Sequence, residues 1–226
     1  MIADLIQPPA HGAEAFGDNP GAVLFPGEDA LIERASPSRR KEFATARECA
    51  RAALARLGQP PAAILADHLG VPRWPDGITG SITHCAGYRA AAVALTSDVV
   101  SVGLDAAPNR PLPRPGMLDV IARESERGCL AGLRETAPGV CWDQMLFSAK
   151  ESVYKAWYPV ARRWLDFESA DIEFDIRRRG FSARLLVHAP PALATAPAIL
   201  RGTWVASAEL LLTAVIVRRT ASPDGE

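Results

Sequence analysis

Four prolines, at positions 108, 111, 113 and 115, interrupt the middle of this chain of 226 residues. Proline fixes its own backbone φ angle and disfavours helix in the residue before it, so we expect an extended connector here. Helix-like and strand-like patterns occur on both sides of the connector. The sequence therefore predicts an N-terminal half over residues 1–107 and a C-terminal half over residues 108–226, each built from helices and antiparallel strands.

The first half is expected to contain one long helix. Ser36-Pro37 has the pattern of a helix N-cap followed by proline in the first turn. An apolar stripe continues from there to Gly58, which predicts a helix over residues 39–57. Residues 70–80 are rich in Gly and Pro and are expected to form a loop. Strand-like segments follow at residues 81–84, 89–95 and 99–105.

The second half is expected to contain helices and then strands. Helical patterns cover residues 116–133 and 142–158, and Pro159 is expected to end the second helix. The tail from Thr220 to Glu226 is expected to be disordered. Strand-like segments occur at residues 171–175, 181–187, 200–206 and 210–217.

The composition is that of an ordinary globular protein, with 48% hydrophobic and 23% charged residues. Lys and Arg number 25 and Asp and Glu number 26, so the net charge favours neither a nucleic-acid nor a membrane partner. The longest apolar run, residues 210–217, is too short for a membrane helix, and residues 1–9 lack the pattern of a signal peptide. The cysteines form no CxxC pair, so free thiols in a reducing cytoplasm are the simplest interpretation.

The predicted helix over residues 142–158 carries an unusual polar face. Glu151 and Lys155 fall nearly opposite its apolar stripe. Taken alone, they form an ordinary solvated Glu–Lys pair one turn apart. Three aromatic residues, Phe147, Tyr154 and Tyr158, surround Glu151, however, so we expect a second surface of the protein to pack against this face.

Asp105 ends the apolar, strand-like run over residues 99–105. An aspartate after a strand and before a proline commonly caps a turn. Alternatively, Asp105 forms a shared site with Glu151 and the two lysines near it, Lys150 and Lys155. Two carboxylates and two amines are the groups that hold Mg²⁺ against a pyrophosphate and support transfer of a phosphoryl-linked group.

Residues 80–85, Gly-Ser-Ile-Thr-His-Cys, lie where a loop enters a strand. Backbone N–H groups and a hydroxyl in this segment can hold a phosphate oxygen, and His84 can donate to another. Ser81 and Thr83 are the candidate hydroxyls. The alternative for His84 is an ordinary histidine at the end of a strand. No GxSxG serine accompanies it in the sequence, so a hydrolase triad is unsupported.

Taken together, these segments resemble the 4′-phosphopantetheinyl transferase family of the surfactin and enterobactin type. The resemblance extends over residues 39–168 in the family's order. The matching stretches are Arg39–Phe43 with Arg47 and Ala50-Arg51, then Trp74–Gly77, Gly80–Tyr88, Val102–Asp105, Phe147–Trp157 and Trp164–Glu168.

The resemblance implies an α+β fold in which two similar halves, related by a pseudo-twofold axis, enclose coenzyme A and Mg²⁺ in the cleft between them. The implied reaction transfers the phosphopantetheine arm of coenzyme A to a serine of an acyl or peptidyl carrier protein and releases adenosine 3′,5′-bisphosphate. A chain of this length supplies both halves itself, so a monomer is expected.

The resemblance also implies roles for individual residues. Asp105 and Glu151 would hold Mg²⁺, and Glu151 or a metal-bound water would take the serine proton. Lys155 would offset charge on the departing bisphosphate, and Lys150 would lie near the phosphates or the carrier. The remaining contacts to the phosphates and the adenine end of coenzyme A are assigned to Arg39 or Arg40, Arg47, Ser81, Thr83 and His84.

Two positions depart from the family's pattern. The family usually has Asp-x-Glu at the end of the strand, whereas Ala107 takes the place of the glutamate here. Ala66 lies about where related chains carry a lysine, for which His68 or Arg73 would have to substitute. Both losses fall on metal or phosphate contacts. The alternative function is therefore a weakly active or non-catalytic relative that binds coenzyme A or a carrier protein.

Overall fold

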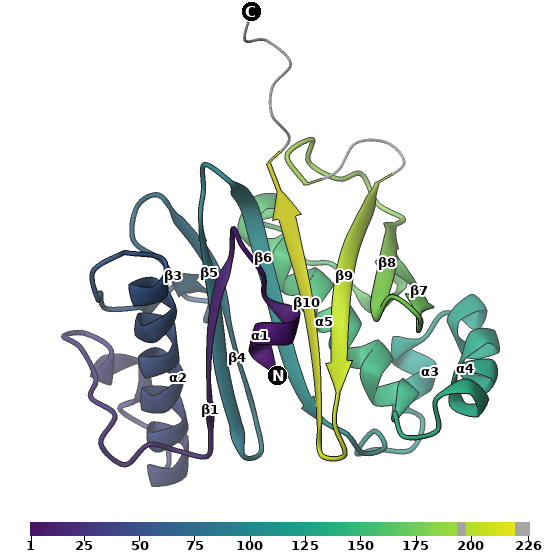
Figure 1. Cartoon of the computed structure of the whole chain (residues 1–226), viewed down its shortest axis with the longest axis horizontal. Coiled ribbons are helices and arrows are strands. Elements are labelled where there is room, and N and C mark those ends of the chain that lie inside the picture. The colour runs from purple at the N-terminus through teal and green to yellow at the C-terminus, as the bar shows by residue number, and fades with distance from the viewer. Residues whose placement is uncertain (194–197, 220–226) are drawn as a thin grey trace, which may run out of the picture.

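The computed structural model describes residues 1–193 and 198–219, so the predicted disorder of residues 220–226 lies outside the described residues. The described chain forms two antiparallel sheets side by side (Figure 1). The first sheet has the order β1 (His11–Phe16), β5 (Tyr88–Leu95), β4 (Ile78–Cys85). The second has the order β6 (Val99–Pro108), β10 (Leu210–Arg218), β9 (Ile199–Ala206), β8 (Gly180–Leu185), β7 (Ala170–Asp175).

The helices and a small hairpin complete the fold. A short hairpin consists of β2 (Leu65–Ala66) and β3 (Pro72–Arg73). The helices are α1 (Ile2–Leu5), α2 (Pro37–Arg56), α3 (Met117–Ile121), α4 (Glu124–Thr136) and α5 (Trp142–Ala161), with 3₁₀ turns η1 (Asp29–Ile32) and η2 (Phe167–Ser169). None of the helices within the described ranges combines the length and the hydrophobicity that crossing a bilayer requires. All four cysteines are free.

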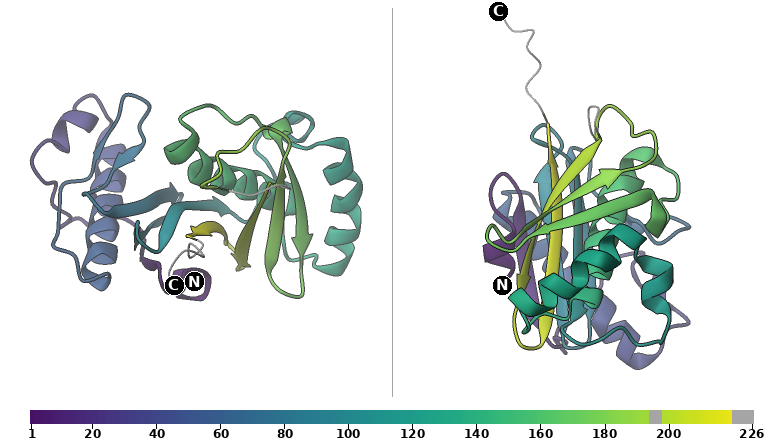
Figure 2. Two further views of the ribbon diagram at one scale, coloured as in Figure 1. Left: turned by 90° about the horizontal axis from the view of Figure 1, so that it is seen from above. Right: turned by 90° about the vertical axis from the view of Figure 1, so that its right-hand side faces the viewer.

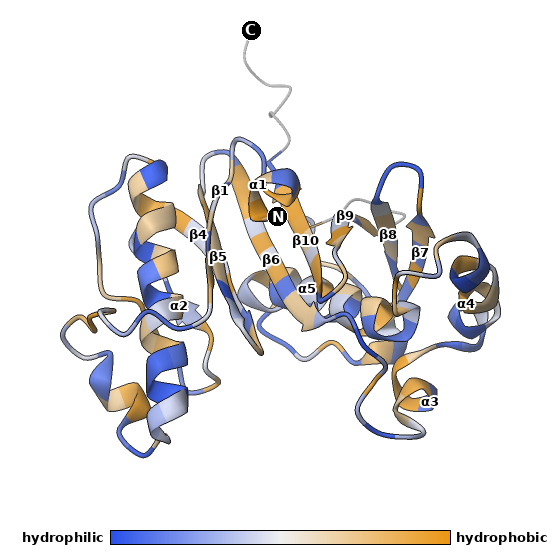
Figure 3. Cartoon of the chain, turned by 60° about the horizontal axis from the view of Figure 1, so that its bottom comes forward, coloured by the Kyte–Doolittle hydropathy of each residue, from blue (hydrophilic) through white to orange (hydrophobic). Residues whose placement is uncertain are grey.

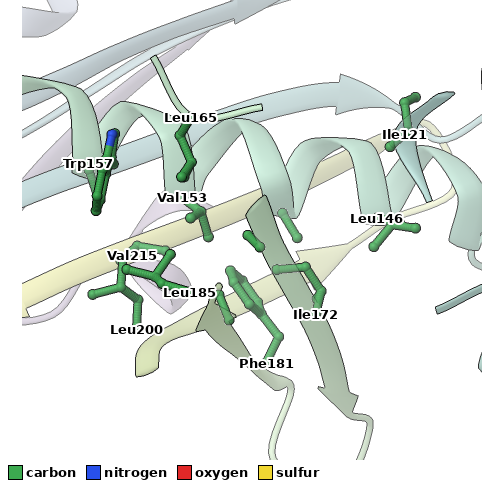
Figure 4. Packing of buried hydrophobic residues seen from close by; sticks show 14 of the residues in the cluster. Ile121, Leu146, Val153, Trp157, Leu165, Ile172, Phe181, Leu185, Leu200 and Val215 are labelled. Atoms are coloured by element: carbon green, nitrogen blue, oxygen red, sulfur yellow. The ribbon is translucent and has the colours of Figure 1, made fainter. Parts of the chain in front are cut away.

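Each sheet is covered by one helix of 20 residues, α2 on the first sheet and α5 on the second (Figure 2). On α2, Ala50 and Leu54 pack against Ala91 and Val93 of β5. On α5, apolar side chains pack against strands β7 to β10 in a separate core (Figure 4). Figure 3 shows the central strands β6 and β10 as largely hydrophobic and the turn between β7 and β8 as hydrophilic. The predicted α+β fold of two similar halves is confirmed.

Most of the predicted elements are present, with three corrections. Residues 70–80, expected to form a loop, contain β3 and the first residues of β4, because Ile78 to Gly80 pair with β5. The predicted helix over residues 116–133 is interrupted at Ala122, whose extended backbone separates α3 from α4. The prediction that Pro159 ends its helix is wrong, because α5 continues to Ala161. Pro159 lies in the last turn, where its missing N–H removes a single helical hydrogen bond. Arg162, with φ of 52°, then closes the helix by donating its N–H to the carbonyl of Tyr158.

The two sheets are joined by side chains where β4 meets β6. Ser81 Oγ accepts a hydrogen bond of 3.1 Å from the N–H of Leu104, and Thr83 Oγ1 accepts one of 2.9 Å from the N–H of Ala106. Strand β6 is the last strand of the predicted first half, but it pairs with β10 and therefore belongs to the sheet of the second half. The division of the chain at residues 107 and 108 stays a prediction.

Helix α5 lies directly on β6, because Gly103 leaves room for it. A Cβ atom at Gly103 would lie 1.9 Å from the carbonyl oxygen of Ser152 in α5. Nearby, Ser101 Oγ donates a hydrogen bond of 2.7 Å to the carbonyl of Ala156. This close approach sets the position of α5 relative to Asp105, the next residue of β6 on the same face.

We expect Gly103→Ala to destabilise the protein by about 1–3 kcal/mol or more, since backbone atoms of α5 must move to admit the methyl group. The measurement is urea-induced unfolding. Gly128→Ala is the matched control, because nothing lies within 4 Å of a Cβ at Gly128. Alanine is also the better helix former, so the control should be neutral or stabilising. Equal unfolding midpoints for the two variants would contradict the tight contact of α5 with β6.

Candidate active site

A cavity of about 570 Å³ lies between α2 and α5, with walls from both halves of the chain. The face of α5 that carries Glu151 lines this cavity, as the surrounding aromatic residues suggested. From α5 the wall includes Glu151, Tyr154, Lys155, Tyr158 and Pro159. From the first half it includes Leu31, Ile32, Arg39, Phe43, Arg47, Ala66, Asp67, Leu69, Val71, Ser81 and His84.

Asp105 is held against the middle of α5 by two side chains of that helix. Lys155 Nζ donates to Asp105 Oδ1 at 2.7 Å, and Ser148 Oγ donates to Asp105 Oδ2 at 2.8 Å. Asp105 lies within β6, opposite Thr213 of β10, so its interpretation as a turn cap is wrong. The interpretation of Lys155 as half of a solvated pair with Glu151 is also wrong, because its ion pair is with Asp105.

Glu151 is half-buried in the cavity wall, close enough to Asp105 for the two charges to interact. Burial raises the pKa of the Glu151 carboxyl, the negative charge of Asp105 raises it further, and Lys155 partly offsets the shift. Asp105 itself is 7% exposed and is not among the residues that line the cavity. Two carboxylates that repel each other form a site that a cation would stabilise. Among residues 1–193 and 198–219, no group of three or more His, Cys, Asp or Glu side chains is placed to hold a metal ion.

The opposite wall carries positive charge. Arg39 Nη1 lies 2.5 Å from Glu42 Oε2 and 2.9 Å from His84 Nε2. The guanidinium of Arg47 stacks on the ring of Phe43, 3.9 Å from its centroid, and Arg47 Nε donates to the carbonyl of Ile64. Burial lowers the pKa of Arg47 to about 10, so it still carries its charge at neutral pH.

Of the two arginines at the start of α2, the structure brings only Arg39 to the cavity wall. Arg40 instead donates to the carbonyls of Ala35 and Glu33 and so fastens the turn that precedes α2. Among the candidate hydroxyls, Ser81 lines the cavity whereas Thr83 lies outside its wall. Both hydroxyls already accept hydrogen bonds from β6, as described above.

Lys150 was expected near the phosphates or the carrier, but it does not line the cavity. It is 3% exposed, and its Nζ lies 2.7 Å from Glu126 Oε2 of α4. It also donates to the carbonyls of Ile121 and Phe167, at 2.8 and 2.6 Å. The three donors of its ammonium group are thereby used. Adjacent residues of a helix point about 100° apart, so Lys150 faces α3 and α4 while Glu151 faces the cavity.

The structure also shows where Ala107 and Ala66 lie, the two positions that depart from the family's pattern. Ala107 follows Asp105 by two residues in β6, so both residues point to the same face of the strand. Ala66 lines the cavity described above, whereas His68 and Arg73 line a neighbouring cavity of about 670 Å³. Neither His68 nor Arg73 lines the first cavity, so neither replaces the lysine expected at position 66.

Cationic side chains that face carboxylates across one cavity are typical of enzymes that act on phosphorylated substrates. Residues 27–94 match the family model of the 4′-phosphopantetheinyl transferase N-terminal domain, and residues 101–204 match that of the 4′-phosphopantetheinyl transferase superfamily. The chain therefore belongs to the 4′-phosphopantetheinyl transferase superfamily and is an enzyme of that kind.

Individual relatives support this assignment along the whole chain. The chain is 48% identical to 4′-phosphopantetheinyl transferase Svp of Streptomyces mobaraensis, over all of this chain and 91% of that protein. It is 45% identical to 4′-phosphopantetheinyl transferase PptT of Mycobacterium tuberculosis, over 91% of each chain. It is 39% identical to 4′-phosphopantetheinyl transferase Npt of Nocardia iowensis, over 95% of this chain and 99% of that protein.

Proposed function

We propose that this transferase moves the 4′-phosphopantetheine group of coenzyme A to a serine of an acyl or peptidyl carrier protein. The reaction would depend on Mg²⁺ and release adenosine 3′,5′-bisphosphate. The observation that supports this most strongly is one cavity in which Arg39 and His84 of the first half face Glu151 and Lys155 of α5. Each copy of the chain carries both walls, so we propose that the monomer is the active unit.

The cationic wall suits the phosphates of coenzyme A. Arg39 and Arg47 come from one face of α2, and a guanidinium group matches the geometry of phosphate oxygens. His84 lies beside Arg39, and Ser81 lies on the same strand three residues earlier. We assign these four residues to the phosphates and the adenine end of coenzyme A. Lys155 faces them from α5 and would offset charge on the departing bisphosphate.

Glu151 on the cavity wall and the buried Asp105 near it form a donor set that fits Mg²⁺. Asp105 and Glu151 supply carboxylate oxygens, and their repulsion contributes to the raised pKa of Glu151. Mg²⁺ in proteins is commonly bound by one or two carboxylates, with substrate phosphates and waters as the other ligands. Bound there, the cation would neutralise the pyrophosphate and orient it for in-line attack.

Glu151 is the residue that we assign to proton removal, directly or through a water. The attacking serine must lose its proton as its oxygen bonds to phosphorus. A carboxyl whose pKa lies above its ordinary value is a stronger base. Lys150 has no part in this proposal, because its ammonium group is buried against Glu126.

The test is incubation with coenzyme A, Mg²⁺ and an apo carrier protein, followed by mass spectrometry of the carrier. The proposal predicts a gain of one phosphopantetheinyl group, and no gain when EDTA replaces Mg²⁺. A carrier in which the acceptor serine is replaced by alanine is the control. Binding of coenzyme A without a mass gain would instead support the non-catalytic alternative.

Restoring a carboxylate at position 107 should strengthen metal binding. Ala107 shares the face of β6 with Asp105, so the side chain of Ala107→Glu would extend toward the same region. We expect the Mg²⁺ concentration for half-maximal rate to fall several-fold, with a small change in the rate at saturating Mg²⁺. Ala107→Gln controls for side-chain size. An unchanged Mg²⁺ requirement in the glutamate variant would show that position 107 does not face the metal.

A further inference from the structure

Glu42 contacts both Arg39 and His84, two of the groups that we assign to a phosphate. On α2 it lies one turn after Arg39, and its Oε2 lies 2.5 Å from Arg39 Nη1. Its Oε1 lies 3.2 Å from His84 Nδ1 on β4 and 3.6 Å from Arg89 Nη2 on β5. One carboxylate thus holds groups from three separate elements. Burial alone would raise the pKa of Glu42, but the Arg39 hydrogen bond and the surrounding positive charges lower it, so Glu42 is ionised at neutral pH.

The hydrogen bonds around His84 define where its proton lies. Arg39 Nη1 lies 2.9 Å from His84 Nε2, and a guanidinium can only donate, so Nε2 accepts with its lone pair. The ring proton is therefore on Nδ1, which lies 3.2 Å from Glu42 Oε1. In this state His84 is neutral. Burial lowers its pKa, and the charge of Arg39 lowers it further.

This neutral tautomer cannot donate to a phosphate. An anion bound against this wall would attract Arg39 away from His84 Nε2, since a charged phosphate oxygen is a better acceptor than an imidazole nitrogen. Nε2 would then be free to take up a proton and donate to the phosphate as well. The negative charge of Glu42, close to Nδ1, would stabilise the imidazolium that results.

On this basis, which rests on the proposed binding of coenzyme A, we propose that Glu42 is a positioning residue that couples phosphate binding to the uptake of one proton by His84. Four charged groups face this imidazole. Arg39 and Glu42 come from α2, Arg89 from β5 and Lys155 from α5. Arg89 is paired with Asp18 at 2.7 Å, and its charge has the smallest effect of the four on the pKa of His84.

The sign of the proton exchange separates this coupling from simple charge attraction. Cations that surround a phosphate monoester lower its second pKa, ordinarily about 6, so they cause proton release or no exchange near pH 7.5. Protonation of His84 causes uptake. Linkage then requires the affinity for coenzyme A to fall as the pH rises, because the complex holds more protons than the free protein.

The experiment is isothermal titration calorimetry of the full-length protein with coenzyme A and Mg²⁺, without carrier, at pH 7.5. Two buffers of different ionisation enthalpy, Hepes and Tris, give the number of protons exchanged. We expect wild type to take up a large fraction of one proton, and its Kd to increase by up to about tenfold per pH unit above pH 7.

We expect Glu42→Gln to bind coenzyme A more weakly and to lose most of this proton uptake, because a neutral amide does not stabilise the imidazolium. His84→Gln should also lose it. Glu135→Gln, which removes an exposed carboxylate on α4, is the matched control and should behave as wild type. A merely structural Glu42 would lower the melting temperature of Glu42→Gln without changing the proton count. His84 is partly exposed at 38%, so its variant tests the coupling even where Glu42→Gln fails to fold.

The outcomes separate this inference from the proposed function. Proton uptake by wild type that disappears in the two variants supports the coupling. Tight binding of coenzyme A without uptake overturns the coupling and leaves the proposed function standing. Uptake that persists in Glu42→Gln or in His84→Gln overturns the role of that residue. Failure of wild type to bind coenzyme A at any pH between 6 and 8 overturns both proposals.

Discussion

Replacement of Glu151 by glutamine is expected to lower kcat for carrier modification by about 10²–10⁴-fold, the usual contribution of a positioned general base. The substitution keeps the shape of a side chain that lines the cavity. It removes both the basic oxygen and one of the two carboxylates that we assign to Mg²⁺. The measurement is the rate of phosphopantetheinyl transfer at saturating coenzyme A and Mg²⁺.

The same substitution should leave the fold intact. Burial and Asp105 raise the pKa of Glu151, so the ionised carboxylate is less stable in the folded protein than in the unfolded chain. Replacing this carboxyl by a neutral amide therefore does not lower stability, and a slight increase is expected. The control is Glu135→Gln, at an exposed position of α4. Full transferase activity in Glu151→Gln would refute the role assigned to this residue.

Lys150→Met is expected to have the largest effect on stability, a loss of about 3–5 kcal/mol in the free energy of unfolding. Lys150 and Glu126 form an ion pair whose side chains are 2% and 1% exposed. Methionine approximates the volume of the lysine stem but leaves the Glu126 charge buried without its partner. The carbonyls of Ile121 and Phe167 also lose their donor. Urea-induced unfolding measures the loss.

A second substitution identifies the cause of that loss. In the double variant Lys150→Met, Glu126→Gln, the isolated buried charge is gone, so part of the stability should return. Full recovery is not expected, because Glu126 also accepts from the backbone N–H groups of Arg123 and Ile172. Unchanged stability of Lys150→Met, together with weaker binding of coenzyme A, would instead show that Lys150 contacts the phosphates.

Local sequence patterns predicted the elements whose ends or faces are marked by nearby residues in the chain. Ser36-Pro37 marked the start of α2, where Ser36 Oγ accepts from the N–H of Arg39. The aromatic residues around Glu151 indicated that its face of α5 meets another surface, and the cavity confirms this. The proximity of Asp105 to Glu151, in contrast, came from the resemblance to a family. No spacing along the chain relates a strand residue to a helix residue 46 positions later.

The missed features all depend on tertiary contacts. β1, with the sequence His-Gly-Ala-Glu-Ala-Phe, has no β-branched residue, and its extended form follows from pairing with β5. The hydrogen bond that Thr83 accepts from β6 was not predicted, because it joins two separate sheets and strand periodicity does not encode such a contact. The ion pair of Lys150 was not predicted either, because its partner, Glu126, lies in another helix. Glu42 lay within a recognised motif, but its three partners became visible only in the fold.

The most direct test of the account is a crystal structure of the protein with coenzyme A and Mn²⁺, in which anomalous scattering locates the cation. The account predicts one anomalous peak within coordination distance of carboxylate oxygens from both Asp105 and Glu151, with pyrophosphate oxygens as further ligands. A peak bound elsewhere, or a pyrophosphate that lies remote from both carboxylates, would contradict it.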